Sequence, residues 1–164
     1  MRIAGLFAGI GGFELGMHRA GHQTALVCDI LPTAKAVLQT RLPDADYRDD
    51  ITNLRALPSD VDLICAGFPC QDLSQAGRTA GLEGERSGLI GDVFRLLSRR
   101  RVPTVVIENV PFMLQLNGGT AMRAIVDEFE RRGYRWAYRV VDSWSFGLAQ
   151  RRERVFLVAS RELD

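Results

Sequence analysis

Short apolar runs alternate with amphipathic stretches along this chain, and this alternation constrains its fold more than any other feature. Residues 2–7, 23–29, 61–67 and 103–110 predict buried strands, and 135–142 and 152–160 predict two more. The stretches at 12–21, 31–42, 87–101 and 120–134 predict helices. Strands and helices that alternate in this way are typical of an α/β fold, with a mostly parallel twisted sheet and helices on both faces.

Length and composition predict one soluble domain, residues 1–164. Hydrophobic residues make up 46% and charged residues 25%, which is ordinary for a globular protein. No apolar run approaches the roughly 18 residues of a membrane span, and we interpret the apolar N-terminus as part of the fold. The three cysteines contain no CxxC pair, so a reducing cytoplasm is the simpler expectation. His18 and His22 have no third ligand nearby in the sequence, so we predict no metal site.

Charge is distributed unevenly, although the net charge is only +1. Residues 1–85 carry 7 Lys+Arg against 11 Asp+Glu, whereas residues 86–164 carry 14 against 9. A basic half is compatible with a phosphate-rich partner. Arg99, Arg100 and Arg101 are equally compatible with a solvated helix end.

The residues with chemical potential fall where predicted strands end. They are Phe7–Gly12, Asp29, Pro69–Cys70 and Glu108–Asn109. In parallel sheets, ligands bind at the carboxyl ends of the strands, so we expect one crevice there. The glycines of the first loop allow a close backbone approach to a nucleotide cofactor, and Asp29 can accept hydrogen bonds from a ribose. The spacing is not the GxGxxG of dinucleotide binders, and a tight turn without a ligand is the alternative.

Cys70 follows Pro69 at a strand end, where a thiolate can meet a substrate, whereas Cys65 lies inside the strand and is expected to pack. The alternative is that Cys70 is also packed, and no nearby His supports a cysteine hydrolase. Glu108 closes an apolar strand and needs either a function or a salt-bridge partner. The arginines of Gln150–Arg154 suit a phosphate or a base oxygen, or form surface ion pairs.

Together, the segments FAGIGGF (7–13), DDIT (49–52), GFPCQDLS (67–74), IENV (107–110) and QRRERVF (150–156) resemble the cytosine-C5 methyltransferase family. The resemblance runs from residue 3 to about residue 160. It implies a Rossmann-like methyltransferase fold and S-adenosyl-L-methionine as the cofactor, without a metal. The implied cofactor-binding residues are Phe7, Gly9, Ile10, Gly11, Gly12, Asp29, Asp50, Ile51, Pro69 and Ile90. Asp29 stands where the family more often has Glu, and Ile30 where an aromatic residue often packs on the adenine.

The resemblance also implies a covalent mechanism on a cytosine flipped out of double-stranded DNA. Cys70 adds to carbon 6, Glu108 acts on the N3 side of the ring, and Arg154, helped by Arg152, holds O2. Loop 71–87 then closes over the base. The residues expected near the nucleic acid are Gln71, Ser74, Gln75, Arg78, Asn109 and Gln150.

The sequence departs from the family pattern at its end. In the family, a target-recognition region and two further motifs follow the QRRER strand, and here the sequence stops at Asp164. We therefore expect a truncated methyltransferase fold, with a second polypeptide as a candidate source of the recognition region, and an apolar face left exposed. The leading hypothesis is a DNA cytosine-C5 methyltransferase of restriction-modification type. The alternatives are a tRNA cytosine methyltransferase and an inactive subunit or fragment that only binds cofactor or partner.

Overall fold

The computed structural model describes residues 1–69 and 88–162. The chain divides into two compact units. The first contains Met1–Gly67 and Asp92–Val105, and the second contains Phe68–Gly91 and Val106–Asp164.

Parallel strands form the centre of the first unit. They are β1 (Arg2–Leu6), β2 (Gln23–Cys28), β3 (Asp46–Arg48) and β4 (Leu63–Ala66), in the order β3-β2-β1-β4. The pairs β1–β2, β1–β4 and β2–β3 are all parallel, so the carboxyl ends of these strands share one edge. All four residues of β4 and the last four of β1 are buried, which explains their continuous apolar sequences.

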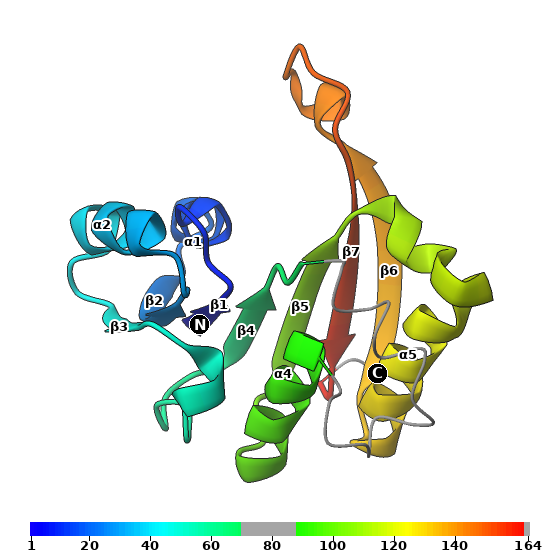
Figure 1. The fold of residues 1–164 in the computed structure, drawn as a ribbon, viewed down its shortest axis with the longest axis horizontal. Coiled ribbons are helices and arrows are strands. Elements are labelled where there is room, and N and C mark those ends of the chain that lie inside the picture. Colours follow the sequence, from blue (N-terminus) through cyan, green and yellow to red (C-terminus); the bar gives the residue numbers. More distant parts are fainter. Residues whose placement is uncertain (70–87, 163–164) are drawn as a thin grey trace. The chain divides into compact units, whose positions relative to one another are not determined.

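Helices α1 (Gly12–Arg19) and α2 (Pro32–Arg41) lie on the same face of these strands (Figure 1). Pro32 occupies the first turn of α2, where its missing N–H costs nothing. Leu38 of α2 is fully buried and packs with Val27 of β2, Ala34 and Leu42. The 3₁₀ helix η1 (Ile51–Asn53) follows β3, and the part of α4 (Gly88–Arg99) from Asp92 onward belongs to this unit.

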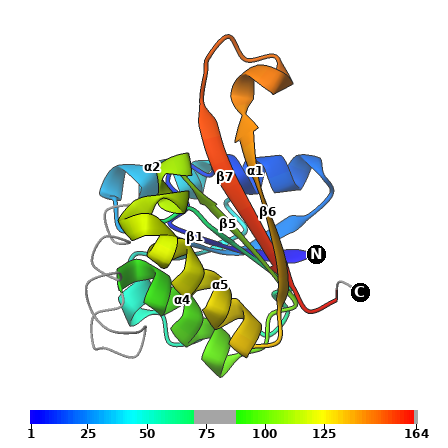
Figure 2. The ribbon, with the colours of Figure 1, turned by 90° about the vertical axis from the view of Figure 1, so that its right-hand side faces the viewer.

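The second unit is built on β5 (Thr104–Asn109), most of which belongs to it, β6 (Arg135–Asp142) and β7 (Glu153–Ser160), in the order β5-β7-β6. Strands β6 and β7 are antiparallel and pair from Arg135 with Ser160 to Asp142 with Glu153. They form a long hairpin with η4 (Ser143–Phe146) at its tip (Figure 2).

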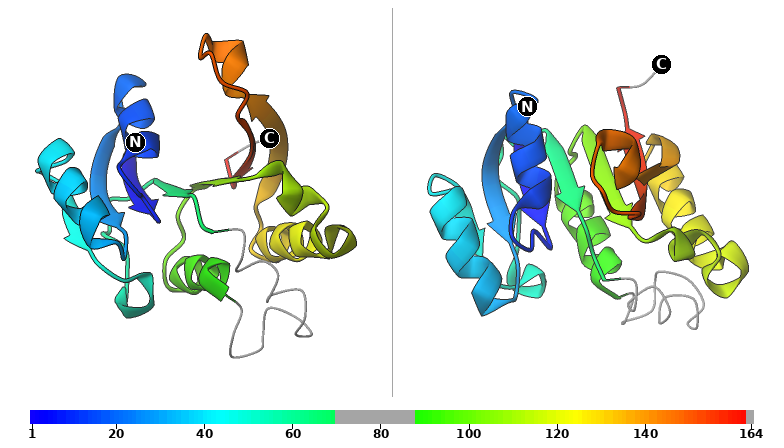
Figure 3. Two further views of the ribbon diagram at one scale, coloured as in Figure 1. Left: turned by 45° about the horizontal axis from the view of Figure 1, so that its top comes forward. Right: turned by 90° about the horizontal axis from the view of Figure 1, so that it is seen from above.

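Helix α5 (Thr120–Arg131) lies along one face of the β6–β7 hairpin (Figure 3) and follows η2 (Pro111–Leu114) and η3 (Leu116–Gly119). Its buried residues include Ile125 and Phe129, and the ring of Phe129 meets that of Tyr134 edge-on, with centroids 5.5 Å apart. Glu128, which is also buried, pairs with Arg131 and Arg132 of the same helical turn.

The predicted strands and helices are confirmed, with ends that differ by one to three residues at most positions. The sequence pattern did not predict β3, which has three residues, or the 3₁₀ helices η1–η4 of the described residues, which are too short to show a period. Within the residues described, no helix is both long and apolar enough to cross a membrane.

Candidate active site

The loop after β1 takes an unusual backbone path. Phe7, Gly9 and Gly11 all have positive φ, at 58°, 55° and 81°. The loop is held by Ala8 N–H, which donates to Cys28 O (3.1 Å), and by Gly11 N–H, which donates to Ala8 O (2.9 Å). A positive φ is easy for glycine but strained for phenylalanine, and such strain is concentrated at functional sites. A Cβ atom built at Gly9 meets no described atom within 4 Å, so the backbone there is open to a ligand.

Asp29 connects this loop to the end of β2. Its Oδ2 accepts a hydrogen bond from Gly9 N–H (2.7 Å), and its Oδ1 accepts one from Leu31 N–H (2.9 Å). The hydroxyl of Tyr47 donates to the Asp29 carbonyl (2.6 Å), and the Asp29 side chain is buried. The expected ribose ligand is therefore also the residue that shapes the glycine loop. Each carboxylate oxygen has a second lone pair, so Asp29 can still accept from a ribose.

Asp50 and Ile51 begin η1. Asp50 caps the helix, because its Oδ1 accepts from Thr52 N–H (2.8 Å), and Ile51 is buried. Arg95 of α4 holds this segment in place. Its guanidinium donates hydrogen bonds to Ile51 O (2.7 Å) and Leu54 O (2.8 Å), and it also forms an ion pair with Asp92. A cavity of about 380 Å³ adjoins the turn, lined by Arg48, Asp49, Asp50, Asn53, Leu54, Arg55 and Ala56.

Two large apolar side chains next to these residues are exposed. Ile10 in the glycine loop is 59% exposed, and Ile30, directly after Asp29, is 71% exposed. Apolar side chains beside polar ligand-binding groups are typical of cofactor sites. The exposed side chain of Ile30 is therefore free to contact a ligand bound beside Asp29.

In the second unit, Glu108 of β5 and Arg154 of β7 form an ion pair, with Oε1 2.8 Å from Nε. Both are only about a quarter exposed, at 24% and 23%. The structure thus supplies the salt-bridge partner that the sequence analysis held as the alternative for Glu108, and this partner is itself one of the expected catalytic residues. Carboxyl and guanidinium groups held together at a strand end can bind a ring that offers both acceptors and donors.

Asn109 lies next to Glu108 but is buried. Its Nδ2 donates to Phe68 O (2.9 Å), and its Oδ1 accepts from Val110 N–H (2.9 Å). The sequence analysis expected Asn109 near nucleic acid. In the structure its amide fixes the backbone at Phe68, and the expected contact with nucleic acid stays a prediction. Pro69 is exposed, whereas Ile90, also expected at the cofactor, is fully buried in α4.

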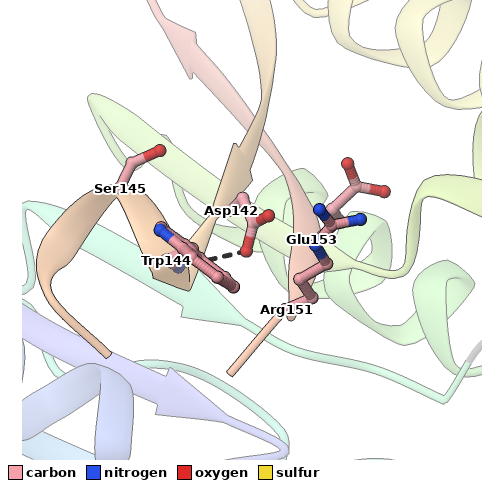
Figure 4. Close-up of a pocket in the computed structure, with 5 residues that line it drawn as sticks. All are labelled: Asp142, Trp144, Ser145, Arg151 and Glu153. Atoms are coloured by element: carbon pink, nitrogen blue, oxygen red, sulfur yellow. Dashed lines mark hydrogen bonds between the residues drawn. The ribbon is translucent and has the colours of Figure 1, made fainter. Parts of the chain in front are cut away.

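The tip of the β6–β7 hairpin carries Gln150 and Arg152, two further residues that the sequence places at the site. Asp142 Oδ1 accepts from Trp144 N–H (3.1 Å) and from the backbone N–H of Arg152 (3.0 Å). The side chains of Gln150 and Arg152 are exposed. A cavity of about 450 Å³ lies at this tip. It is lined by Asp142, Trp144, Ser145, Arg151 and Glu153 (Figure 4). Its two carboxylates make it a poor site for a phosphate.

Cys70, Gln71, Ser74, Gln75 and Arg78 lie outside the described residues. The structure does decide the roles of the other two cysteines. Cys28 and Cys65 are free and buried, as expected for Cys65. Burial, with a smaller effect of Asp50, raises the pKa of the Cys28 thiol to about 12, and burial also raises the pKa of Cys65. Both thiols are therefore unreactive, which leaves Cys70 as the candidate nucleophile.

The sequence analysis missed two residues that shape the site, Glu14 and Arg95. Glu14 is in the first turn of α1, where an acid usually caps a helix from the surface, but it is 1% exposed. The partners of Arg95 are backbone carbonyl groups about 40 positions away, which no pattern reveals. His18, which was not expected to bind a metal, hydrogen-bonds through Nε2 to Thr24 Oγ1 (2.8 Å).

Comparison with solved structures identifies the fold. The Dnmt2 methyltransferase of S. pombe matches with a TM-score of 0.80 at 20% identity, covering 100% of this chain and 52% of that one. An E. coli structure titled a putative DNA modification methyltransferase of a prophage matches with a TM-score of 0.76 at 22% identity, covering 98% and 46%. The chain therefore has the α/β fold of these methyltransferases, and the fold prediction is confirmed.

Sequence comparison identifies the family. The profile of the C-5 cytosine-specific DNA methylase family matches residues 1–164. Type II methyltransferase M2.BsuMI of Bacillus subtilis is 51% identical over 164 residues, and M.NgoFVII of Neisseria gonorrhoeae is 35% identical. Each alignment covers 98% of this chain but only 42% and 44% of the relative. The chain belongs to the C-5 cytosine-specific DNA methylase family and spans less than half the length of these relatives.

Proposed function

We propose that this chain carries the cofactor-binding and catalytic residues of a DNA cytosine-C5 methyltransferase, of the modification type that the names of its relatives denote. The proposed cofactor is S-adenosyl-L-methionine, and the proposed substrate is cytosine in double-stranded DNA. Family membership and the pairing of Glu108 with Arg154 support this proposal.

The residues of the first unit fit the proposed cofactor. The open backbone at Gly9 admits close approach, Asp29 has lone pairs left for ribose hydroxyls, and Ile30 offers an apolar surface to the adenine. Asp50 and Ile51 remain the proposed adenine contacts, held by Arg95. When bound, S-adenosyl-L-methionine supplies an electrophilic methyl group and leaves as S-adenosyl-L-homocysteine.

The proposed chemistry uses residues assigned to the second unit. The Cys70 thiolate forms a bond to carbon 6 of cytosine, and the electron pair of the C5=C6 bond becomes available at carbon 5. Glu108 stabilises the added charge at N3 by a hydrogen bond or a proton, while Arg154, helped by Arg152, binds O2. After carbon 5 is methylated, a base removes its proton, the double bond re-forms and the Cys70 thiolate leaves.

The observation that carries the proposal is the Glu108–Arg154 ion pair. An ion pair made only for stability gains little when it is partly exposed, and a pair of apolar residues would replace it at little cost. A carboxyl held next to a guanidinium matches the adjacent N3 and O2 of a cytosine ring, because one ring edge then meets both groups. Asn109, adjacent to Glu108, fixes the backbone at Phe68, two residues before Cys70 in the sequence.

Covalent trapping tests the proposal. Double-stranded DNA containing 5-fluorocytosine is incubated with the protein and S-adenosyl-L-methionine, and adducts that survive denaturation are counted. Fluorine at carbon 5 cannot leave as a proton does, so a competent site stays attached to the DNA. We expect an adduct in the wild type and none in Cys70→Ser. Absence of an adduct in the wild type, with cofactor binding intact, would indicate a chain that only binds.

A further inference from the structure

Glu14 has the least exposed carboxyl among the described residues, at 1%. It reaches from α1 onto β1, where the sequence has a glycine. A Cβ atom built at Gly5 is only 1.9 Å from Glu14 Oε1, so any larger residue at position 5 collides with this carboxyl. The fold therefore leaves a space for the Glu14 side chain directly over β1, an inner strand of the first unit.

The second carboxyl oxygen of Glu14 points toward the glycine loop. Oε2 lies 3.9 Å from a Cβ atom built at Gly11, the residue that caps α1, and it has no hydrogen-bond partner among the described atoms. A buried polar atom without a partner is rare in folded proteins, and each one needs an explanation.

Among the described residues, the groups packed around Glu14 do not neutralise a negative charge there. The end of β2 contributes Asp29, which is acidic, and β4 contributes Cys65, whose thiol is neutral. Leu38 and Leu42 approach Gly11 from the α2 side and are apolar. The pKa of Glu14 is raised from 4.5 to about 7, mainly by burial; a hydrogen bond to its own backbone N–H lowers it, and the negative charge of Asp29 adds to the rise. Near neutral pH the carboxyl is therefore poised between its two forms.

We propose that Glu14 is a positioning residue for the glycine loop, residues 7–12. In its neutral form the carboxyl packs near Gly11 and keeps the loop in place, and its ionisation loosens the loop and weakens cofactor binding. This inference rests on the proposed use of S-adenosyl-L-methionine. A buried carboxylate without a partner is relieved only by moving toward water. Because Glu14 sits in the first turn of α1, that movement displaces Gly11 and, with it, the bond between Gly9 N–H and Asp29.

The test measures binding of S-adenosyl-L-methionine by calorimetry at pH 6 and pH 8, using the whole chain. If only the neutral form supports the loop, the wild type binds about tenfold more weakly at pH 8, because a group with a pKa near 7 is then about nine-tenths ionised. Glu14→Gln keeps the shape of the side chain but cannot ionise. It is expected to bind S-adenosyl-L-methionine equally at both pH values, with the affinity that the wild type has when Glu14 is neutral. Asp44→Asn removes an exposed acid of the same unit and is expected to follow the wild type.

A purely structural role for Glu14 predicts a different result. Glu14→Gln then changes stability but leaves the pH dependence of binding as in the wild type, which overturns the proposal. A wild type whose affinity is the same at both pH values overturns it as well.

A second measurement separates this inference from the proposed cofactor. The amide NMR signals of Gly9 and Gly11 are followed from pH 6 to 8.5 without ligand, in the wild type and in Glu14→Gln. If the wild type binds no S-adenosyl-L-methionine at either pH, the proposed cofactor fails. A shift of both amides that is centred near pH 7 and absent from Glu14→Gln then still supports the control of the loop by Glu14. Amides that do not titrate, or that titrate equally in both proteins, contradict it.

Discussion

Glu108 Oε1 and Arg154 Nε lie 2.8 Å apart on β5 and β7, and each side chain is only about a quarter exposed. The pair is therefore largely shielded from bulk water, but a ligand can still reach it. Such a position strengthens charge-assisted hydrogen bonds to a bound ring compared with the same groups on the surface.

Removal of the Arg154 guanidinium is predicted to slow catalysis strongly without loss of cofactor binding. Arg154→Ala leaves Glu108 without its partner and removes the donor proposed for O2, so methyl transfer is expected to fall at least about 100-fold. Arg139→Ala is the matched control, because Arg139 lies on the neighbouring strand β6, opposite Phe156, and is exposed. Labelled-methyl assays and calorimetry measure the two properties separately. If both variants lost methyl transfer equally, the effect would come from the overall positive charge and not from the position of Arg154.

Replacement of Asp29 is predicted to affect the glycine loop as well as the ribose. Asp29→Ala removes the acceptor for both Gly9 N–H and Leu31 N–H, and hydrogen bonds to a charged group contribute about 1.5–3 kcal/mol each. Affinity for S-adenosyl-L-methionine is expected to fall about 10- to 100-fold or more, and the melting temperature is expected to fall as well. Calorimetry measures the affinity and thermal unfolding the melting temperature, and both values are compared with those of the control variant Asp44→Asn. Binding by Asp29→Ala at wild-type strength would exclude Asp29 from the cofactor site.

The buried Glu14 carboxyl is predicted to make the protein less stable as the pH rises. The pKa is 4.5 in a model compound and about 7 in the fold, so between these values the folded protein keeps a proton that the unfolded chain has lost. The free energy of unfolding therefore falls from about pH 4.5 to 7 by roughly 3 kcal/mol, and this contribution is constant above pH 7. Urea unfolding at several pH values measures it. In Glu14→Gln this fall should be absent, and its persistence would assign the pH dependence to other groups.

Arg95 is predicted to stabilise the segment around η1. Arg95→Met keeps the aliphatic stem but removes the bonds to Ile51 O and Leu54 O, and a loss of about 1–3 kcal/mol is expected from the unpaired carbonyls. Arg99→Met is the control, since Arg99 is exposed and contacts one carbonyl, that of Arg55. Urea unfolding should show the larger loss for Arg95→Met. A loss as large for Arg99→Met would contradict this account.

The fold was largely predictable because its signals are local. The strand that becomes β4 is an uninterrupted apolar run, and β1 and β5 each contain one, so the burial of these runs follows from the sequence pattern. Short elements such as β3 depend on a neighbouring strand rather than on their own sequence, because Asp46–Arg48 contains only three residues paired with Leu26–Cys28. Propensity cannot identify a strand of that length.

The candidate site was only partly predictable. Motifs identified Asp29 and Glu108 as polar residues at strand ends, but not that Asp29 binds Gly9 N–H or that Glu108 pairs with Arg154. Motifs likewise singled out Asn109, but not that it is buried with its amide bonded to Phe68 O. Glu14 was missed because its burial depends on the space above Gly5, a property of the packed helix and strand rather than of the sequence around either residue.

The most direct test of the central claim is transfer of labelled methyl from S-adenosyl-L-methionine to mixed-sequence duplex DNA, with bulk tRNA in parallel and Cys70→Ser as the blank. The account predicts label in DNA that is absent with the mutant. Label that persists with Cys70→Ser would contradict the covalent mechanism, and label confined to tRNA would contradict the proposed substrate. No label in either, from a folded chain that binds the cofactor, would contradict the proposed catalysis and indicate a chain that only binds.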